Sequence, residues 1–325
     1  MPITPPKRPV GPAEKTPVDP KRPVGPADTS TYGQKPYESE RKGPSASTIE
    51  QYGLTAEEIK DVNAIKVTIS DPCPIVILFG AKTSGKTMTL VRLTRYLRQN
   101  HYRVEPDRIF RASSSEAYQT MCDKFDEVIT NDNAAGGTSV IGFMLVIVRD
   151  CNGKPICQIL EAPGEHYFDE KDVKKPFPRY INEIMSMPNR RTWVFIVERN
   201  WKDNSTRNAY AEKVISMQNR IPTSDKVIFT CHKADCSDNL YKNGRPLTKQ
   251  FFSDIKNQYP GIFSRYVNHN PITSLWNPYN FDFLAFSSGT FSDLLGGGQS
   301  YVPSSEFYPA QLWAKIKKAV SGRWF

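Results

Sequence analysis

The residues best suited to chemistry form one run, Gly80-Ala81-Lys82-Thr83-Ser84-Gly85-Lys86-Thr87. The run matches the full GxxxxGK[ST] pattern, which is typical of a loop that binds nucleotide phosphates. Glycines let backbone N–H groups close around phosphate oxygens, and a helix that starts at the end of the run adds positive potential. In this pattern Lys86 reaches the β- and γ-phosphates and Thr87 ligates Mg²⁺. The plainer alternative is a glycine-rich turn without a ligand.

Three later segments place polar side chains directly after predicted strands. They are Glu161-Ala162-Pro163-Gly164, His232-Lys233-Ala234-Asp235 and Ser287-Ser288-Gly289. Open α/β sheets bind ligands at the carboxyl ends of their strands. Each segment is a weak signal alone, and the second could be an ordinary exposed turn. Their common placement predicts that they share one site with the glycine-rich run.

The elements that must position these segments alternate between strands and helices. The apolar run 74–79 predicts a strand buried on both faces, and 86–99 predicts the helix after the glycine-rich run. An Asn-Gly turn at 152–153 joins two hairpin strands, 139–148 and 156–160. Further strands are expected at 192–197, 226–230 and 281–286, and helices at 113–128, 179–187, 206–220, 248–258 and 311–320. This alternation predicts a three-layer α/β/α fold whose sheet is mostly parallel, with one antiparallel hairpin strand.

The chain is expected to divide into three parts. Residues 1–45 are proline-rich and contain the octapeptide PKRPVGPA twice, so we expect a disordered tail that serves as a linker or as a ligand for another module. Residues 46–69 form a leader with a helix around 47–62 and a strand at 65–69. Residues 70–325 form the nucleotide-binding domain, with insertions.

Together these motifs resemble the Ras-like P-loop GTPases over about residues 70–325. The resemblance implies GTP or GDP with Mg²⁺ as the ligands. Glu161 stands where DxxG has aspartate and would hold the metal, while Gly164 would meet the γ-phosphate. His232 replaces the asparagine of NKxD, a feature also found in the Rag branch. The resemblance also implies which ligand groups the remaining motif residues would contact. It places Gly80, Lys82, Thr83, Ser84 and Gly85 at the phosphates, and Lys233, Asp235, Ser287 and Ser288 at guanine.

The resemblance is weakest at the residues that would promote hydrolysis. It implies a switch threonine that ligates Mg²⁺, for which Thr138 is the candidate and Thr130 the competitor. Glu165 occupies the place of the usual glutamine, and His166 could position water if the register shifts by one residue. Lys82 stands where small GTPases usually have glycine, and it either supplies positive charge or points to solvent. We therefore expect slow or unconventional hydrolysis.

Three functions follow from these patterns. The first is a GTPase that acts as a conformational switch, read by a protein effector or regulator. The second is a scaffold that binds GTP or GDP with very slow hydrolysis or none. The third is an ATPase or a kinase, against which the HKxD and SSG segments argue.

Composition limits the remaining possibilities. The net charge of +9 suits an anionic partner, but no basic and aromatic stripe indicates nucleic acid. Six scattered cysteines without a CxxC pair argue against a structural zinc site, and no apolar run is long enough to span a bilayer. We expect a cytoplasmic protein with reduced thiols.

Overall fold

The computed structural model describes residues 53–112, 115–130, 141–236, 240–242, 244–293 and 299–322, all of which belong to one compact unit, Pro44–Phe325. The tail expected at 1–45 and the threonine proposed as a switch residue, Thr138, lie outside the described residues.

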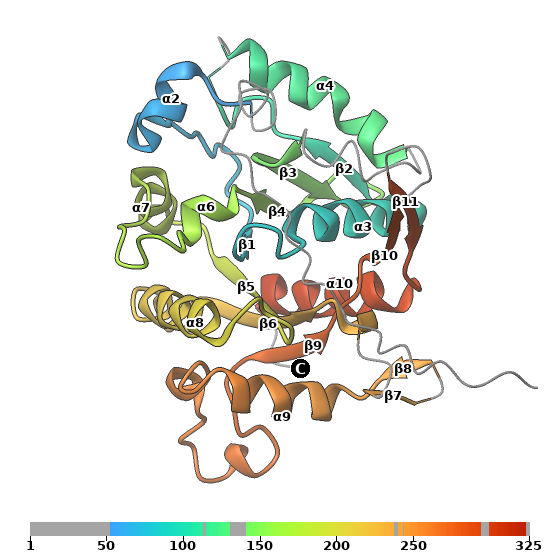
Figure 1. Ribbon diagram of the computed structural model, residues 1–325. Coiled ribbons are helices and arrows are strands. Elements are labelled where there is room, and N and C mark those ends of the chain that lie inside the picture. The colour runs from blue at the N-terminus through green and yellow to red at the C-terminus, as the bar shows by residue number, and fades with distance from the viewer. Residues whose placement is uncertain are drawn as a thin grey trace, which may run out of the picture. The chain divides into compact units, whose positions relative to one another are not determined.

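A seven-stranded sheet in the order β2-β3-β4-β1-β5-β6-β9 forms the centre of this unit (Figure 1). Only β3 runs against the others, because it pairs antiparallel with both β2 and β4. The strands are β1 (Ile75–Phe79), β2 (Arg103–Pro106), β3 (Met144–Arg149), β4 (Pro155–Glu161), β5 (Arg191–Glu198), β6 (Lys226–His232) and β9 (Asp282–Ala285). The predicted fold class, a mostly parallel sheet with one antiparallel hairpin strand, is confirmed.

Burial explains why these segments become central strands. Every residue of β1 and β5 is buried, and both are rich in valine, isoleucine and phenylalanine. Such side chains suit a strand covered on both faces. β1 pairs in parallel with β4 on one side and β5 on the other, so that the chain leaving β1 emerges at the middle of the sheet. A loop at that position lies between the ends of neighbouring strands, where ligands bind in open α/β sheets.

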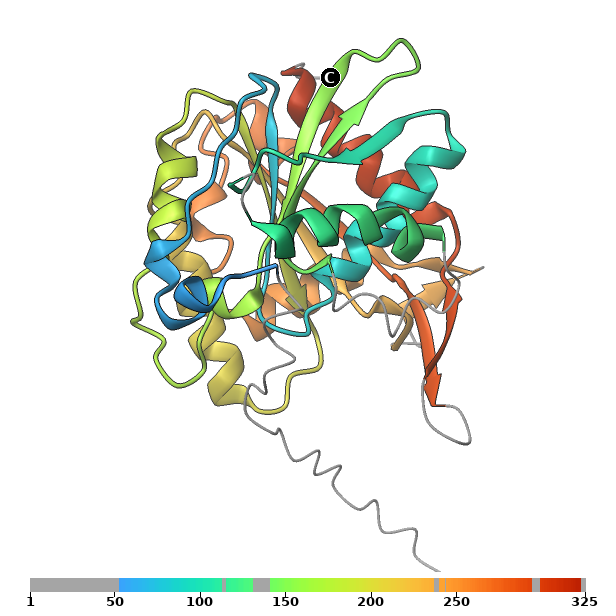
Figure 2. The same ribbon diagram turned by 90° about the horizontal axis from the view of Figure 1, so that it is seen from above.

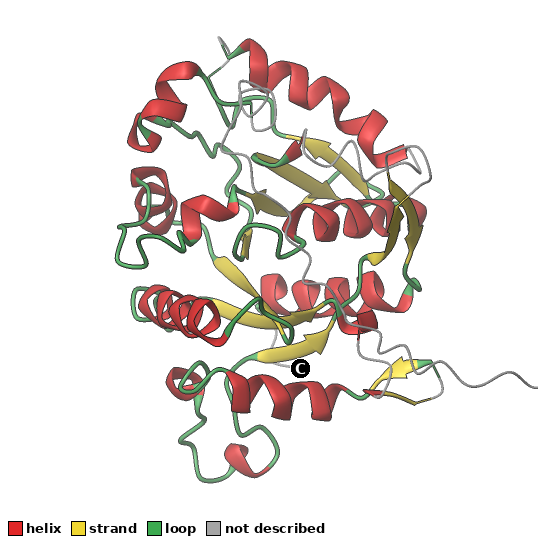
Figure 3. Cartoon of the chain, viewed as in Figure 1, coloured by secondary structure: helices red, strands yellow, loops and turns green. Residues whose placement is uncertain are grey.

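Helices cover both faces of the sheet (Figures 2 and 3). α3 and α10 lie side by side on one face, and α7, α8 and α9 lie on the other. α8 begins where Asp203 accepts a hydrogen bond from the Thr206 backbone N–H at 2.8 Å, a standard N-cap. The helix bounds are α2 (Ala56–Lys60), α3 (Lys86–Gln99), α4 (Glu116–Thr130), α6 (Gly164–Tyr167), α7 (Arg179–Ser186), α8 (Asn204–Gln218), α9 (Thr248–Gln258) and α10 (Phe307–Ser321).

The leader differs from its prediction. The expected strand at 65–69 is extended chain outside the sheet, and the Thr68 backbone N–H donates to the Phe110 carbonyl at 2.8 Å. Within the described residues, the leader's helix is only the short α2, capped by Thr55. Leu54 and Ile65 are nevertheless buried in the main core, so the leader packs with the domain that follows.

Smaller elements complete the described chain. β10 (Gly289–Asp293) and β11 (Gln299–Pro303) form a two-stranded antiparallel ribbon directly after the SSG segment, and β7 (Tyr241–Lys242) pairs with β8 (Arg245–Pro246). The 3₁₀ turns within the described ranges are η1 (Val62–Ala64), η3 (Ala234–Cys236), η5 (Ser264–Tyr266) and η6 (Thr273–Leu275). None of the six cysteines forms a disulfide bond, and Cys151 and Cys236 are the exposed ones. No helix in the described ranges is long and apolar enough to cross a bilayer.

Candidate functional site

The glycine-rich run forms the loop between β1 and α3, and α3 begins at Lys86. Thr83 and Gly85 both have positive φ, at 62° and 90°. A Cβ on Gly85 would lie 3.1 Å from Nδ1 of His232, so a larger residue would crowd this junction. The backbone therefore turns sharply just before the helix N-terminus, which favours anions.

Lys86 lies at the floor of this loop. Its Nζ donates a hydrogen bond to the Ala81 carbonyl at 3.0 Å, and its side chain is buried. Burial lowers the pKa of Lys86, while the nearby carboxylates of Glu161, Glu165 and Glu198 oppose this effect. The ammonium is thus held at the start of α3 among carboxylates, within the loop whose pattern binds phosphates.

Thr87 and Glu161 bring two oxygen atoms together beside the loop. The Thr87 hydroxyl donates to Glu161 Oε1 at 2.8 Å, and Glu161 is buried at the end of β4. Burial raises the pKa of Glu161, and within the described residues its Oε2 has no hydrogen-bond partner. Hydroxyl and carboxylate oxygens are ligands that Mg²⁺ accepts, so this pair fits the ion. No group of three His, Cys, Asp or Glu side chains in the described residues could hold a metal, so phosphate and water oxygens would have to complete its shell.

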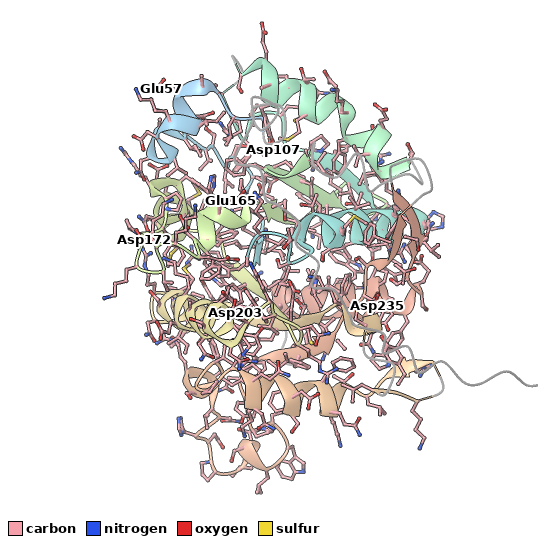
Figure 4. All side chains as sticks on the ribbon, viewed as in Figure 1. Glu57, Asp107, Glu165, Asp172, Asp203 and Asp235 are labelled. Carbon is pink, nitrogen blue, oxygen red and sulfur yellow. The ribbon has the colours of Figure 1, made fainter. Side chains whose placement is uncertain are left out.

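The turn after β4 packs directly against the loop. A Cβ added to Gly164 would lie 2.2 Å from the backbone nitrogen of Lys82, so only glycine fits there. The Lys82 ammonium forms an ion pair with Glu165 at 2.9 Å. Burial alone would raise the pKa of Glu165, but its own backbone N–H and Lys82 bring the net pKa below its ordinary value. Figure 4 labels Glu165 on α6, which follows β4, and Asp235, which follows β6.

His166 takes part in a buried aromatic cluster. Its Nδ1 lies 2.9 Å from the Tyr180 hydroxyl, and its ring centroid lies 5.7 Å from those of Phe143 and Tyr180. Burial lowers the pKa of His166 to about 4, so the ring is neutral near pH 7. These contacts are structural, and His166 does not line the pocket described below.

The HKxD segment leaves β6 beside the glycine-rich loop. His232 is buried and stacks on Phe286 with ring centroids 4.9 Å apart. Burial and the charge of Lys233 lower the pKa of His232 to about 3, although a backbone hydrogen bond with Ser84 partly opposes this. Neutral His232 thus joins the HKxD segment to the glycine-rich loop.

Lys233 adopts a left-handed backbone conformation with φ of 54° and forms an ion pair with Glu198 at 2.5 Å. Among the described residues, the non-glycine residues with positive φ are Thr83, His101 and Lys233. Such conformations are costly and cluster at functional sites. Thr83 and Lys233 both face the same pocket, which marks it as the candidate site.

That pocket has a volume of about 650 Å³, within the range of small-molecule sites. The predicted site residues that line it are Thr83, Ser84, Gly85, Lys86, Thr87, His232, Lys233, Asp235 and Ser288. The predicted residues outside its lining are Gly80, Lys82, Glu161, Gly164, Glu165, His166 and Ser287. Glu161, Gly164 and Glu165 still contact the glycine-rich loop, through Thr87 and Lys82, so the two groups meet at that loop.

The SSG segment closes the pocket through the β10–β11 ribbon. The Ser288 carbonyl accepts a hydrogen bond from the Tyr301 hydroxyl at 2.5 Å, and the Ser287 carbonyl accepts one from Ser304 Oγ at 2.6 Å. Gly289 has φ of 138°, and a Cβ there would lie 2.3 Å from the Val302 carbonyl oxygen. The segment is therefore fixed at the pocket wall by the ribbon that follows it.

Sequence reasoning missed several residues at this site. Phe291 on β10 lines the pocket, as do Met88, Cys236 and Thr290. Glu198, at the end of β5, holds Lys233 in place. Burial raises the pKa of Glu198, and Lys233 partly offsets that rise. Glu198 and Phe291 could have been found from their positions in the sequence, because Glu198 ends a central strand and Phe291 closely follows the SSG segment.

Comparisons with known proteins give only distant similarities. No protein-family model matches the chain, and no curated protein matches it. The signal recognition particle receptor SRb–GTP/SRX complex from Chaetomium thermophilum is similar at 10% identity and a TM-score of 0.34, over 67% of this chain and 92% of that one. The GTP-bound Ski7 GTPase-like domain from S. cerevisiae is similar at 16% identity and a TM-score of 0.36, over 83% of this chain and 53% of that one.

A third structure, the GDP-bound RocCORdC of Methanosarcina barkeri Roco2, is similar at 14% identity and a TM-score of 0.28. It is covered over 46% of its length, and this chain over 69%. The chain thus spans about half the length of the Ski7 and Roco2 chains. At such low identities and TM-scores, a function must be argued from the chain's own site.

Proposed function

We propose that this chain binds guanine nucleotides, GTP or GDP, together with Mg²⁺, and hydrolyses GTP slowly to GDP and phosphate. The observation that carries the proposal is the single pocket wall shared by the glycine-rich loop, the HKxD segment and Ser288. Phosphates would lie over the start of α3, where the loop N–H groups and Lys86 supply positive charge. The far end of the pocket, lined by Asp235 and Ser288, would receive the base.

Base selection would rest on Asp235. A carboxylate accepts the N1–H and N2–H hydrogen bonds that guanine donates, and adenine offers no such pair. The Lys233 side chain and the Phe291 ring supply flat or apolar surface along the same pocket. This arrangement favours guanine over adenine and argues against the ATPase alternative.

Metal binding would rest on Thr87 and Glu161, with phosphate and water oxygens as the remaining ligands. Bound Mg²⁺ would neutralise charge that develops on the phosphates. The chain's own part is to orient these oxygens and to hold Lys86 at the phosphates. Thr138 is proposed as the threonine that responds to the γ-phosphate.

Hydrolysis would depend on the turn after β4. Glu165 is held by Lys82 with a lowered pKa, so it carries negative charge near neutral pH and would repel a γ-phosphate unless Lys82 stays close. His166 is engaged with Tyr180. This chemistry favours slow turnover, and the Lys82–Glu165 pair is also what favours the scaffold alternative. A conformational switch read by a protein effector, in the cytoplasm, remains part of the proposal.

A competition titration tests the proposal. In the presence of Mg²⁺, a fluorescent GDP analogue bound to the full chain would be displaced in parallel by GDP, GTP, ADP and ATP. We expect only the guanine nucleotides to compete. The Lys86→Ala variant should not bind the analogue at all, which makes it the control for specific binding.

If ATP competes as well as GTP does, the proposed selectivity for guanine is wrong, and only the prediction of a nucleotide-binding loop stands. A single-turnover assay with radiolabelled GTP then separates slow hydrolysis from none, and so the enzyme from the scaffold.

A further inference from the structure

A loop between α9 and β9 holds the most exposed large apolar side chains of the described chain. Ile272, Leu275 and Trp276 are 68%, 76% and 74% exposed. They flank or belong to the 3₁₀ turn η6 and lie within five consecutive residues. We call these three residues the apolar tip. Large exposed apolar groups of this kind mark interaction sites when they are gathered rather than scattered.

The loop is built to hold the tip outward. The Asn268 side chain donates to Thr273 Oγ1 at 2.9 Å and to the Asn277 carbonyl at 2.8 Å. Asn270 Oδ1 accepts hydrogen bonds from the backbone N–H groups of Ile272 and Thr273, at 3.0 and 3.1 Å. These bonds fix the turn, so the apolar side chains face water in a formed structure.

The base of the loop is anchored separately. Phe263 stacks on Phe252 with centroids 5.1 Å apart and lies 4.8 Å from Phe281. Val267 and Tyr279 form a β-bridge where the two sides of the loop meet. This aromatic base is part of the core or packs against it, whereas the three side chains of the tip lie outside the core.

The charged residues near the apolar tip indicate which kind of surface the tip would contact. The sequence contains no acidic residue between Asp254 and Asp282. These two flanking carboxylates are each paired with a cation of the domain, at 2.9 and 2.7 Å. Within the stretch, Lys256 and Arg265 are exposed and positive. Lys256 lies over the Tyr279 ring at the base of the loop. An apolar projection whose base carries exposed positive charge is complementary to an anionic surface with an apolar interior.

We propose that the apolar tip inserts into the headgroup region of an anionic phospholipid membrane. Tryptophan favours this interfacial depth, and Ile272 and Leu275 would be removed from water beside it. The loop precedes β9, whereas the nucleotide pocket lies after the carboxyl ends of β1, β6 and β9. Docking through the tip would therefore leave the pocket accessible to solvent, because the loop enters β9 at its amino end and the pocket lies beyond the carboxyl ends of the strands.

Vesicle sedimentation of the full chain tests this inference, independently of nucleotide binding. The vesicles would contain either phosphatidylcholine alone or phosphatidylcholine with phosphatidylserine. We expect binding to the anionic vesicles, and the double variant Leu275→Ser/Trp276→Ser should partition about tenfold more weakly. Because the variant keeps the basic segment 1–45, the difference isolates the tip. Ile109→Ser, which removes an apolar side chain 52% exposed elsewhere, is the matched control and should bind like the parent.

Tryptophan fluorescence gives a second readout. Insertion should shift the emission of the parent chain to shorter wavelength on anionic vesicles, and Trp276→Phe should lose most of that shift. Equal vesicle binding by the parent and the double variant would overturn the inference. So would a parent chain that ignores both vesicle types, or one that self-associates through the tip, which would make a second copy the partner.

Discussion

At the scale of single side chains, Asp235 is the residue on which the proposed base selection would depend. It lines the pocket beside Lys233, and its carboxylate differs from an amide only in lacking donors. Asp235→Asn should weaken GDP binding by a factor of about 100, because two hydrogen bonds to guanine are lost or reversed. The same variant should bind xanthosine diphosphate better than the parent does, since xanthine presents an acceptor where guanine presents its amino group.

Titrations of parent and variant with both nucleotides measure this exchange. Cys236→Ser, which alters a neighbour lining the same pocket, serves as control and should keep the preference for GDP. Unchanged GDP affinity in Asp235→Asn would show that Asp235 does not read the base.

His232 links the stability of the fold to pH. Its pKa is lowered from 6.5 to about 3 by burial, so below pH 6.5 the unfolded chain takes up a proton that the folded chain does not. The stability it contributes is therefore present above pH 6.5 and is lost as pH falls from 6.5 toward 3, by about 1.4 kcal/mol per pH unit. His232→Asn should reduce the pH dependence by that amount.

Urea unfolding at several pH values between 7.5 and 5.5 measures the slope. The pKa of His166 is also lowered, to about 4, so His166 makes the stability fall with pH over a similar range. The His232→Asn variant should therefore keep roughly half of the pH dependence of stability that the two histidines produce. A His232→Asn slope identical to that of the parent would mean that His232 is not held neutral in the fold.

At the scale of elements, the turn α6 and the glycine-rich loop behave as one packed unit. Gly164→Ala would place a Cβ 2.2 Å from the Lys82 backbone nitrogen, a contact that neither backbone segment can relieve cheaply. We expect a loss of about 2 kcal/mol or more in the free energy of unfolding. Nucleotide affinity should fall as well, because the loop must shift to accommodate the methyl group.

Gly153 offers the matched control, since it has φ of 80° but nothing within 4 Å of an added Cβ. Gly153→Ala should cost about 1 kcal/mol through its backbone conformation alone and leave nucleotide affinity unchanged. Chemical denaturation and the GDP titration together distinguish the two variants. Equal effects of both substitutions would contradict the close packing of α6 on the loop.

At this scale, the elements that could be predicted from the sequence are those with a strong local pattern. β1 and β5 were predictable because their apolar runs are continuous, and the β3–β4 hairpin because Asn152-Gly153 fixes its turn. β2 was missed since Arg103–Pro106 is short and polar and ends in proline, as edge strands often do. The β10–β11 ribbon was missed because its pairing depends on contacts with the pocket wall rather than on a local pattern.

The candidate site was partly predictable for the same reason. The motif residues could be placed together because each follows a strand of one parallel sheet, and ends of such strands share an edge. The partners of these residues could not be predicted. Glu198 pairs with Lys233 across two strands, and His166 pairs with Tyr180 on α7, contacts that exist only once the layers are packed.

At the scale of the whole molecule, folding should not require the proline-rich segment. The compact unit begins at Pro44, and the described core starts with Leu54. Deleting residues 1–45 should therefore change the melting temperature by less than about 2 °C and leave the affinity for GDP unchanged. Differential scanning calorimetry and the nucleotide titration check both parts.

A large fall in the melting temperature would show that the segment contributes to the core. Deleting residues 1–65 instead removes Leu54 and Ile65 from the core and should destabilise the fold strongly, which makes it the positive control.

The distribution of thiols gives the molecule a built-in reporter. Burial raises the pKa of Cys73, Cys122, Cys157 and Cys231, so these four should resist alkylation in the folded chain. The exposed thiols are Cys151, at the β3–β4 turn, and Cys236, in the pocket wall. A maleimide should thus react fastest with these two thiols. Cys151 would serve as an internal standard, and a bound nucleotide would cover Cys236. The labelling ratio of these two sites, read by peptide mass, would report the fraction of molecules that carry nucleotide without any engineered probe.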